Sequence, residues 1–380
     1  MFVPSVLEEI PLLPQHRKLT SFSEQHLPLW MTEYFAWHQE TRNNLNRTNW
    51  KDTKYLVMVC TKDIDSCGGI SDRLKVLPFV VLQAARHKRL LFIDWEKPRP
   101  LQEFLIPPIA GQVDWRVPHW LKRQLKLEES DISYGCQDCN RKLRFQAEDR
   151  LIRLKLQAPD GCESLYAKQP DAYSTYADVF HGIFRALFMP VPRLQAKLEE
   201  QMKDHHLVPG QYAAVHLRNM YGNRIWRHPN ETIALVVNGI NCASTIYPGA
   251  KIYYAADDKF AVDAAREYGR QRSLPVGSLE FNEDPLHIDK VDGWENKSSV
   301  EYDDTFMDLF LLGQARCVAY GNGGYGSFGS LLSYDANCSI RYFRGRNMVR
   351  NCTWTGTDRK ETPLAPPEMH FPKEMYIKPK

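Results

Sequence analysis

Short apolar runs that alternate with amphipathic segments constrain this chain more than any other feature of its sequence. The first set begins with Lys54–Cys60 (KYLVMVC), continues through a segment with helical spacing and reaches Arg89–Asp94 (RLLFID). The second set begins with Tyr212–Arg218 (YAAVHLR) and continues through residues 251–257, 259–272, 303–315 and 317–321. Near-continuous apolar strands separated by amphipathic helices are typical of parallel sheets that helices cover on both faces. The pattern therefore predicts an α/β protein.

The length of 380 residues exceeds what one hydrophobic core usually serves, so we expect two domains. The stretch Phe188–Glu200 (FMPVPRLQAKLEE) marks a boundary between the two sets, and from Arg193 onwards it predicts a helix. We expect an N-terminal extension (1–53), a first α/β domain (54–190), a second α/β domain (191–350) and a proline-rich tail (351–380). Two such Rossmann-like domains would face each other across a cleft at the carboxyl ends of their strands.

The composition is that of an ordinary soluble protein, with 43% hydrophobic and 25% charged residues. The net charge is +3, and its acidic and basic residues are interspersed, which argues against a nucleic-acid groove but allows a local anion site. Residues 1–18 carry acids and prolines where a signal peptide needs an apolar core, and no window approaches the ~18 apolar residues of a membrane span. Taken as a complete N-terminus, this sequence predicts a cytoplasmic protein.

Two other features favour the secretory pathway. Sequons of the Asn-x-Ser/Thr type stand at Asn46, Asn230, Asn296, Asn337 and Asn351. They favour the Golgi or another secretory lumen, which would require a targeting segment or membrane anchor outside the sequence given. The nine cysteines are an odd number, and Cys136 and Cys139 (GCQDCN) fit a small disulfide loop, half of a metal site or two free thiols.

Glycines follow the first strand in the segment Cys67–Pro78 (CGGISDRLKVLP). Gly68 and Gly69 allow a sharp turn and direct N–H groups at whatever lies at the helix N-terminus, where a diphosphate would fit. The alternative is a simple strand-to-helix turn in which Asp72 complements the helix dipole. The segment matches neither the Walker loop nor the dinucleotide fingerprint.

A second glycine-rich segment, residues 320–334 (YGNGGYGSFGSLLSY), follows the last clear strand. Gly323, Gly324 and Ser327 in this segment could supply backbone amides and a hydroxyl in the nest-like form that holds phosphate oxygens. A plain tight turn is the alternative.

His216 and Arg218 lie two residues apart at the exit of a predicted strand, so their side chains leave the same face and can reach one ligand. The planar fork of Arg218 could clamp a phosphate. A buried hydrogen-bonded histidine beside a surface arginine is the alternative.

These motifs together resemble the superfamily of inverting fucosyltransferases, which includes the α1,6-fucosyltransferases, the nodulation fucosyltransferases and the protein O-fucosyltransferases. Scattered motifs carry the resemblance from about Tyr55 to Tyr342. Residues 68–73 (GGISDR) resemble the family loop that approaches the donor diphosphate, and 215–218 (VHLR) are similar to the family's His-Val-Arg-Arg box. By this resemblance His216 faces guanine and Arg218 grips the β-phosphate.

The resemblance extends to three later segments. Residues 253–258 (YYAADD) resemble the strand that ends in paired aspartates, here Asp257 and Asp258. Residues 307–315 (MDLFLLGQA) resemble the segment whose acidic residue, Asp308, holds the nucleoside, and Gly323, Gly324 and Ser327 take the place of the family's phosphate-binding serine motif. The second arginine of the family box is Asn219 here, and Arg224 or Arg227 could replace the missing charge.

The resemblance implies a GT-B architecture in which the first domain lies on the acceptor side and the second binds the nucleotide sugar. It implies fucose metabolism: transfer of fucose from GDP-fucose to a glycan or protein hydroxyl with inversion, using Arg218 and neither cofactor nor metal. The acceptor hydroxyl must lose a proton. The candidate bases or acceptor-binding residues are Asp72, Asp257, Asp258 and His228.

Three other functions compete with this one. Asn219 would suit a catalytically inactive sugar- or nucleotide-binding relative, and the glycine loops and arginines would also suit a sulfotransferase. A metal-dependent glycosyltransferase would use an Asp-x-Asp motif, for which Asp63–Asp65 (DID) has the required form. A solvated turn is the alternative for that motif.

Overall fold

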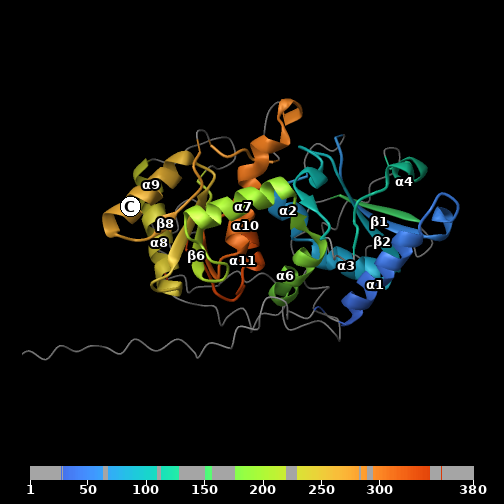
Figure 1. Ribbon diagram of the computed structural model, residues 1–380, viewed down its shortest axis with the longest axis horizontal. Helices are drawn as coiled ribbons and strands as arrows, with labels where there is room; N and C mark the ends of the chain where they lie inside the picture. The colour runs from blue at the N-terminus through green and yellow to red at the C-terminus, as the bar shows by residue number, and fades with distance from the viewer. Residues whose placement is uncertain are drawn as a thin grey trace, which may run out of the picture.

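A computed structural model of the chain describes residues 27, 29–62, 67–108, 113–127, 150–155, 176–219, 229–281, 284–288, 294–342 and 352. Within them, two parallel sheets lie on either side of a central group of helices (Figure 1). The α/β class predicted from the sequence is confirmed.

The first sheet has the strand order β2-β1-β4, and both of its ladders are parallel. Its strands are β1 (Lys54–Cys60), β2 (Arg89–Trp95) and β4 (Leu151–Lys155). All residues of β2 and all but the first of β1 are buried, which explains why these strands are continuous apolar runs in the sequence. Helix α1 (Leu29–Asn44) packs against β2 and against α3 (Leu77–Arg86), so part of the predicted N-terminal extension belongs to this layer.

The second sheet has the order β10-β9-β6-β7-β8, again with parallel neighbours. Its strands are β6 (Tyr212–Leu217), β7 (Lys251–Ala256), β8 (Val276–Gly277), β9 (Cys317–Tyr320) and β10 (Ser339–Arg341). The chain passes from β6 to β7 on one side and later returns to β9 on the other side of β6. Ligands of open parallel sheets bind at the carboxyl ends of the strands where the order reverses in this way. The exits of β6 and β9 are therefore the expected location of a ligand.

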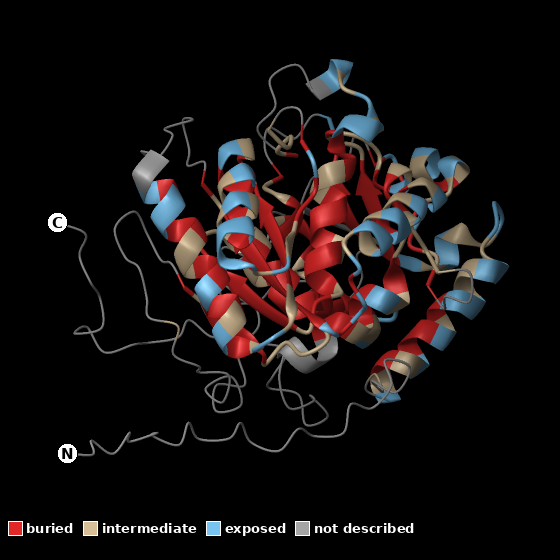
Figure 2. Cartoon of the chain, turned by 60° about the vertical axis from the view of Figure 1, so that its left-hand side comes forward, coloured by how far each residue is buried: buried red, intermediate tan, exposed pale blue. Residues whose placement is uncertain are grey.

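The remaining elements connect and cover these sheets. The longer helices are α6 (Tyr176–Leu187), α7 (Pro192–Asp204), α8 (Pro229–Ile246), α9 (Lys259–Arg272), α10 (Asp303–Gly313) and α11 (Gly324–Leu332). The shorter ones are α2 (Ile70–Leu74), α4 (His119–Gln124) and the 3-10 turns Trp50–Asp52, Leu101–Glu103, Trp294–Asn296 and Ser299–Tyr302. Figure 2 shows buried strands flanked by helices whose outer faces are exposed. Among the described helices, none combines the length and the apolar character that a bilayer span requires.

The two halves of the chain meet around α7. A small antiparallel pair of β3 (Leu105–Ile106) and β5 (Met189–Pro190) leads into this helix, which begins at Pro192 and confirms the helix predicted from Arg193 onwards. Arg193 donates to both carboxylate oxygens of Asp303 on α10 (2.7 and 3.1 Å) and to the backbone carbonyl of Glu103 (3.2 Å). These bonds tie α10 to the loop region of the first half. The domain boundaries themselves remain a prediction.

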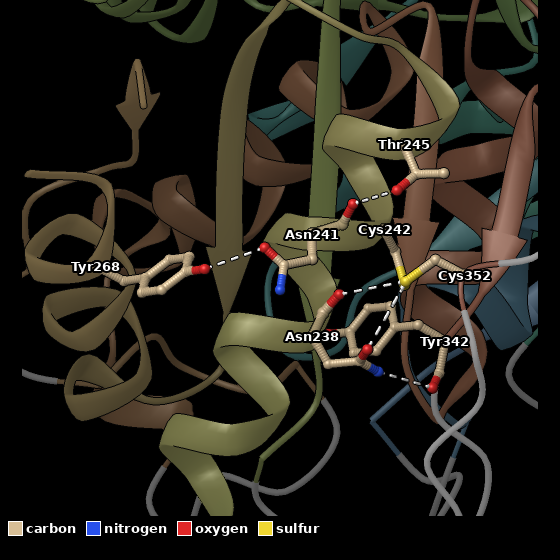
Figure 3. Close-up of a disulfide and its surroundings, with 7 residues drawn as sticks. All are labelled: Asn238, Asn241, Cys242, Thr245, Tyr268, Tyr342 and Cys352. Carbon is tan, nitrogen blue, oxygen red and sulfur yellow. Dashed lines mark hydrogen bonds between the residues drawn. A yellow bond between two sulfur atoms is a disulfide. The ribbon is translucent and has the colours of Figure 1, made fainter. Parts of the chain in front are cut away.

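Three disulfides join the six cysteines within the described residues. Cys60–Cys67 closes the exit of β1, and Cys317–Cys338 joins the start of β9 to the approach to β10. Cys242–Cys352 connects α8 to the segment beyond β10, where Asn238 also donates to the carbonyl of Tyr342 (3.4 Å; Figure 3). Cys136 and Cys139 lie outside the described residues.

Candidate functional site

A cavity of about 240 Å³ lies where α2 from the first half of the chain meets the strand exits of the second sheet. Seven of the predicted site residues line it: Gly69, Asp72, His216, Arg218, Asp257, Asp308 and Gly324. The other lining residues are Ile70, Ser71, Ala256, Pro285, Leu286, His287, Ile288, Thr305 and Tyr325. The structure therefore gathers residues from 69 to 325 into one site.

Other predicted residues do not line the cavity. Gly68, Asp258 and Gly323 are each adjacent in the chain to a residue that lines the cavity, and Ser327 lies two positions after Tyr325, but none of the four is part of the cavity wall. His228, Arg224, Arg227, Asp63 and Asp65 lie outside the described residues, so their proposed roles stay predictions. Within the part of the chain that the structure describes, no three or more His, Cys, Asp or Glu side chains come together as a metal site would require.

His216 presents a neutral ring to the cavity. Its side chain is buried, and the ring centroid lies 4.9 Å from that of Tyr325. Burial, with a smaller contribution from the charge of Arg218, lowers the pKa of His216 to about 3. Its Nδ1 atom has no hydrogen-bond partner among the described residues. An uncharged aromatic ring is suited to an aromatic heterocycle rather than to a phosphate.

Arg218 lies two residues further on, where β6 has ended, and the chain after β9 runs closely against it. Gly323 has a φ of +92°, and a Cβ there would lie 2.8 Å from Cδ of Arg218. A side chain at this position would therefore both strain the backbone and displace the arginine. Gly323 is the N-cap of α11, so the guanidinium and the N-terminus of this helix lie next to the same cavity.

The segment expected to be a glycine-rich nest is helical from Gly324 onwards. Its glycines lie where other elements approach most closely: a Cβ at Gly324, Gly326 or Gly329 would come within 2.8 Å of Ser71, His216 or Leu312 respectively. Packing against these neighbours overrides the low helix propensity of glycine. Anion stabilisation at this site would therefore come from a helix N-terminus rather than from a loop nest.

Asp308 lines the cavity from the second turn of α10. Tyr253 on β7 donates a short hydrogen bond to Oδ1 of Asp308, and burial raises the pKa of this carboxyl group well above its usual range. Thr305, one turn earlier, donates to the carbonyl of Leu286 (2.7 Å) and accepts a hydrogen bond on its own carbonyl from Tyr325. These contacts hold α10, the segment around Leu286 and α11 together around the cavity.

The Asp-Arg pair after the first glycines has a clear structural role. Oδ2 of Asp72 accepts a hydrogen bond from the Gly69 amide (3.0 Å) and so caps α2. This agrees with the alternative in which the segment is a strand-to-helix turn with Asp72 at the start of the helix. The side chain of Arg73 is buried, donates to the Gly68 carbonyl (2.8 Å) and stacks on Trp95 with its guanidinium carbon 4.3 Å from the ring centroid. Arg73 thus fixes the glycine turn to the end of β2. A contact between the Gly69 amide and a diphosphate remains a prediction, because Asp72 occupies that amide here.

Asn219 and Asp258 belong to the interior. Asn219 donates to Asp258 through its side-chain amide and to Asp257 through its backbone N–H (2.6 Å), and it accepts from Thr232 (3.1 Å). Asp258 also caps α9 by accepting from the Phe260 amide (3.0 Å). Asn219, at the position where the resemblance implied a second arginine, therefore supports the strand ends and does not line the cavity.

The sequence did not indicate several lining residues, of which Ser71, His287, Thr305 and Tyr325 carry polar groups. Thr305 lies three residues before Asp308 in a predicted helix, so helical spacing could have indicated that both face the same site. Tyr325 directly follows Gly324 in the second glycine-rich segment. The segment Pro285–Ile288 has neither helix nor strand periodicity, and no local signal marks it.

No protein-family model matches the sequence, and no curated protein matches it either. Among solved structures, a mutant of FUT1 from Arabidopsis thaliana in complex with GDP shares the fold with a TM-score of 0.61 at 11% identity, covering 84% of this chain and 80% of that one. NodZ, a fucosyltransferase from Bradyrhizobium, aligns with a TM-score of 0.44 at 15% identity over 74% of this chain and 93% of that one. POFUT1 in complex with GDP-fucose aligns with a TM-score of 0.31 at 12% identity over 80% and 77%.

The chain therefore shares the fold of FUT1, which is of the GT-B type, as the motifs predicted. The likeness to FUT1 carries this conclusion, because the other two alignments are too loose to add to it.

Proposed function

We propose that this protein is a glycosyltransferase that transfers fucose from GDP-fucose to a hydroxyl group of a glycan or protein, with inversion at the anomeric carbon. One observation carries the proposal: His216, Arg218 and Asp308, which come from different elements, line a single cavity at the point where the strand order of the second sheet reverses. The fold, shared with a FUT1 structure that contains GDP, supports the same donor.

The polarity of the cavity agrees with a nucleoside diphosphate. The neutral ring of His216, with Tyr325 beside it, and the carboxyl group of Asp308 would hold the nucleoside. Arg218 and the N-terminus of α11 would face the diphosphate, where negative charge grows as the glycosidic bond breaks. An attacking hydroxyl in line with that bond would invert the anomeric centre in one displacement.

Nucleotide binding tests the proposal directly. We expect GDP to bind with a Kd at least tenfold below those of UDP and ADP, because His216 and Asp308 occupy the nucleoside end of the site. Isothermal titration with the three nucleotides measures this difference. Equal affinities would remove the guanine assignment, and preferential binding of adenosine bisphosphate would instead favour the sulfotransferase.

We further propose that turnover needs no divalent cation, since Arg218 and the α11 amides can neutralise the leaving diphosphate. Hydrolysis of GDP-fucose should then survive excess chelator, and the double substitution Asp63→Asn with Asp65→Asn should keep most of the activity. Loss of turnover in chelator, with recovery in manganese only when both aspartates are present, would favour the metal-dependent alternative.

A secretory location is part of the proposal. The disulfides of the described residues are of a kind that persists in oxidising compartments, and the sequon asparagines Asn46 and Asn296 are exposed. We therefore propose the Golgi or another secretory lumen as the compartment.

A further inference from the structure

We propose that His287 is the general base that removes the proton from the attacking hydroxyl. This assignment rests on the proposed function and adds a residue that the sequence motifs do not indicate. It concerns an imidazole on the wall of the same cavity as Arg218.

His287 lies at the seam between the two halves of the chain. It belongs to the second half, but its Cε1 atom and Oδ2 of Asp72 both lie within 4 Å of the point where a Cβ of Gly69 would be. In the arrangement that the resemblance implies, the acceptor approaches from the first half and the donor is held by the second. A base that serves this reaction must reach the boundary between them, and His287 does.

The backbone on both sides of His287 is held in place. The carbonyl of Leu286 accepts the hydrogen bond from Thr305 on α10, and the side chain of Ile288 is buried in the core. The histidine between these two anchors is half-buried and lines the cavity. A general base needs such a fixed position, because proton transfer requires hydrogen-bond contact with the attacking oxygen.

The carboxylates of the site already have structural partners. Asp72 accepts from the Gly69 amide, Asp257 accepts from the Asn219 amide, and Asp308 accepts from Tyr253. Asp258 is buried and caps α9.

The proposed step balances as follows. The acceptor oxygen forms a bond to the anomeric carbon of fucose while the bond from that carbon to the β-phosphate oxygen breaks. The electron pair of the broken bond leaves on GDP. The acceptor proton moves to a ring nitrogen of His287 and passes from there to solvent.

The experiment uses hydrolysis of GDP-fucose, in which water is the acceptor and must lose a proton in the same way. We expect His287→Ala to lower this rate by about 10²-fold or more, the usual contribution of a general base, while its GDP affinity by titration and its Tm stay close to those of the wild type. Azide has no proton to lose. In the His287→Ala variant, azide should therefore restore turnover and yield fucosyl azide, which a structural role for His287 would not explain.

His119 provides a matched control, because it is an exposed histidine on α4 outside the cavity. His119→Ala should hydrolyse GDP-fucose at the wild-type rate and gain nothing from azide. Unchanged hydrolysis in His287→Ala, or a loss that azide does not restore in a variant that still binds GDP, would remove His287 as the base. A wild-type protein that neither binds GDP nor cleaves GDP-fucose would instead remove the proposed function, and this assignment with it.

Discussion

Arg218 is the residue whose chemistry the proposed function uses most directly. If its guanidinium meets charge that develops chiefly in the transition state, Arg218→Ala should lower kcat by about 10²-fold or more. Arg218→Lys should recover little of this loss, because an ammonium group cannot reproduce the planar fork. Steady-state hydrolysis of GDP-fucose and thermal melting, measured on the same preparations, check both expectations. A variant with wild-type kcat and unchanged Tm would show that Arg218 does not contact the reacting groups.

Of the residues that line the site, the sequence indicates those that belong to a recognisable local motif. His216 and Arg218 could be placed because they lie at the end of a strand that their own neighbours predict, whereas Asp308 was placed only by the family resemblance of its segment. Tyr253 and His287 could not be placed, because their importance comes from contacts through space: Tyr253 donates to a carboxyl group 55 positions away, and His287 approaches Gly69. Such contacts depend on the packing of elements, which local patterns do not specify.

The turn that leads into α11 connects the conformation of one glycine to the position of Arg218. Gly323→Ala adds a Cβ at a positive φ and within 2.8 Å of Arg218, so we expect a loss of stability of ~1–3 kcal/mol together with a lower kcat/KM for GDP-fucose hydrolysis. In an Arg218→Ala background the same substitution should have little further effect on kcat/KM, because the side chain it displaces is absent. A double-mutant cycle measures this coupling.

Gly249 supplies the comparison for Gly323. It has a φ of +75°, close to that of Gly323, but a Cβ there would meet nothing within 4 Å. Gly249→Ala should therefore lower Tm through backbone strain and leave kcat/KM unchanged. If both alanine variants lost the same amount of activity, strain alone would account for the effect and the contact with Arg218 would not matter.

Elements buried on both faces are the ones that the sequence predicts best. The bounds of β1 agree with the apolar run, and β2, β6, β7 and β9 each differ by one residue at one end. The short strands β8 and β10, at the edges of their sheet, have too few residues to show a period. Helix α11 was missed because its glycines predict a turn, and only the neighbours that require them to be small explain why they are helical.

Buried neutral histidines make the stability of the whole molecule depend on pH. Burial lowers the pKa of His38 on α1 to about 4 and those of His181 and His216 to about 3. Each of these groups binds a proton more readily in the unfolded chain, so its contribution to stability is complete above about pH 6.5 and is lost as the pH falls towards its folded pKa. Burial raises the pKa of Asp308, so its effect on stability has the opposite pH dependence: it favours folding at low pH and is lost as the pH rises through the folded pKa.

A single substitution isolates one of these contributions. His38→Gln removes a titrating group whose Nε2 lies 2.9 Å from the Leu91 carbonyl, and the glutamine amide can keep a donor there. We expect the fall in unfolding free energy between pH 7 and pH 5 to be smaller by about 2 kcal/mol in the variant than in the wild type. Urea titrations at the two pH values measure the difference, and identical pH dependence would mean that His38 is not neutral in the folded protein.

The long span of Cys242–Cys352 has a consequence for how this chain is made. The two cysteines are 110 positions apart, whereas Cys60–Cys67 and Cys317–Cys338 span 7 and 21. At a synthesis rate of ~5–20 residues per second, Cys242 waits roughly 5 to 20 s for its partner. Cys317 and Cys338 emerge during that interval, and in the folded protein both of their sulfurs lie within 4.0 Å of the Ile246 carbonyl at the end of α8, the helix that carries Cys242. Cys317 and Cys338 are therefore available to Cys242 before its native partner is, and if either pairs with it, thiol–disulfide exchange has to release Cys242 before Cys352 can be joined to α8.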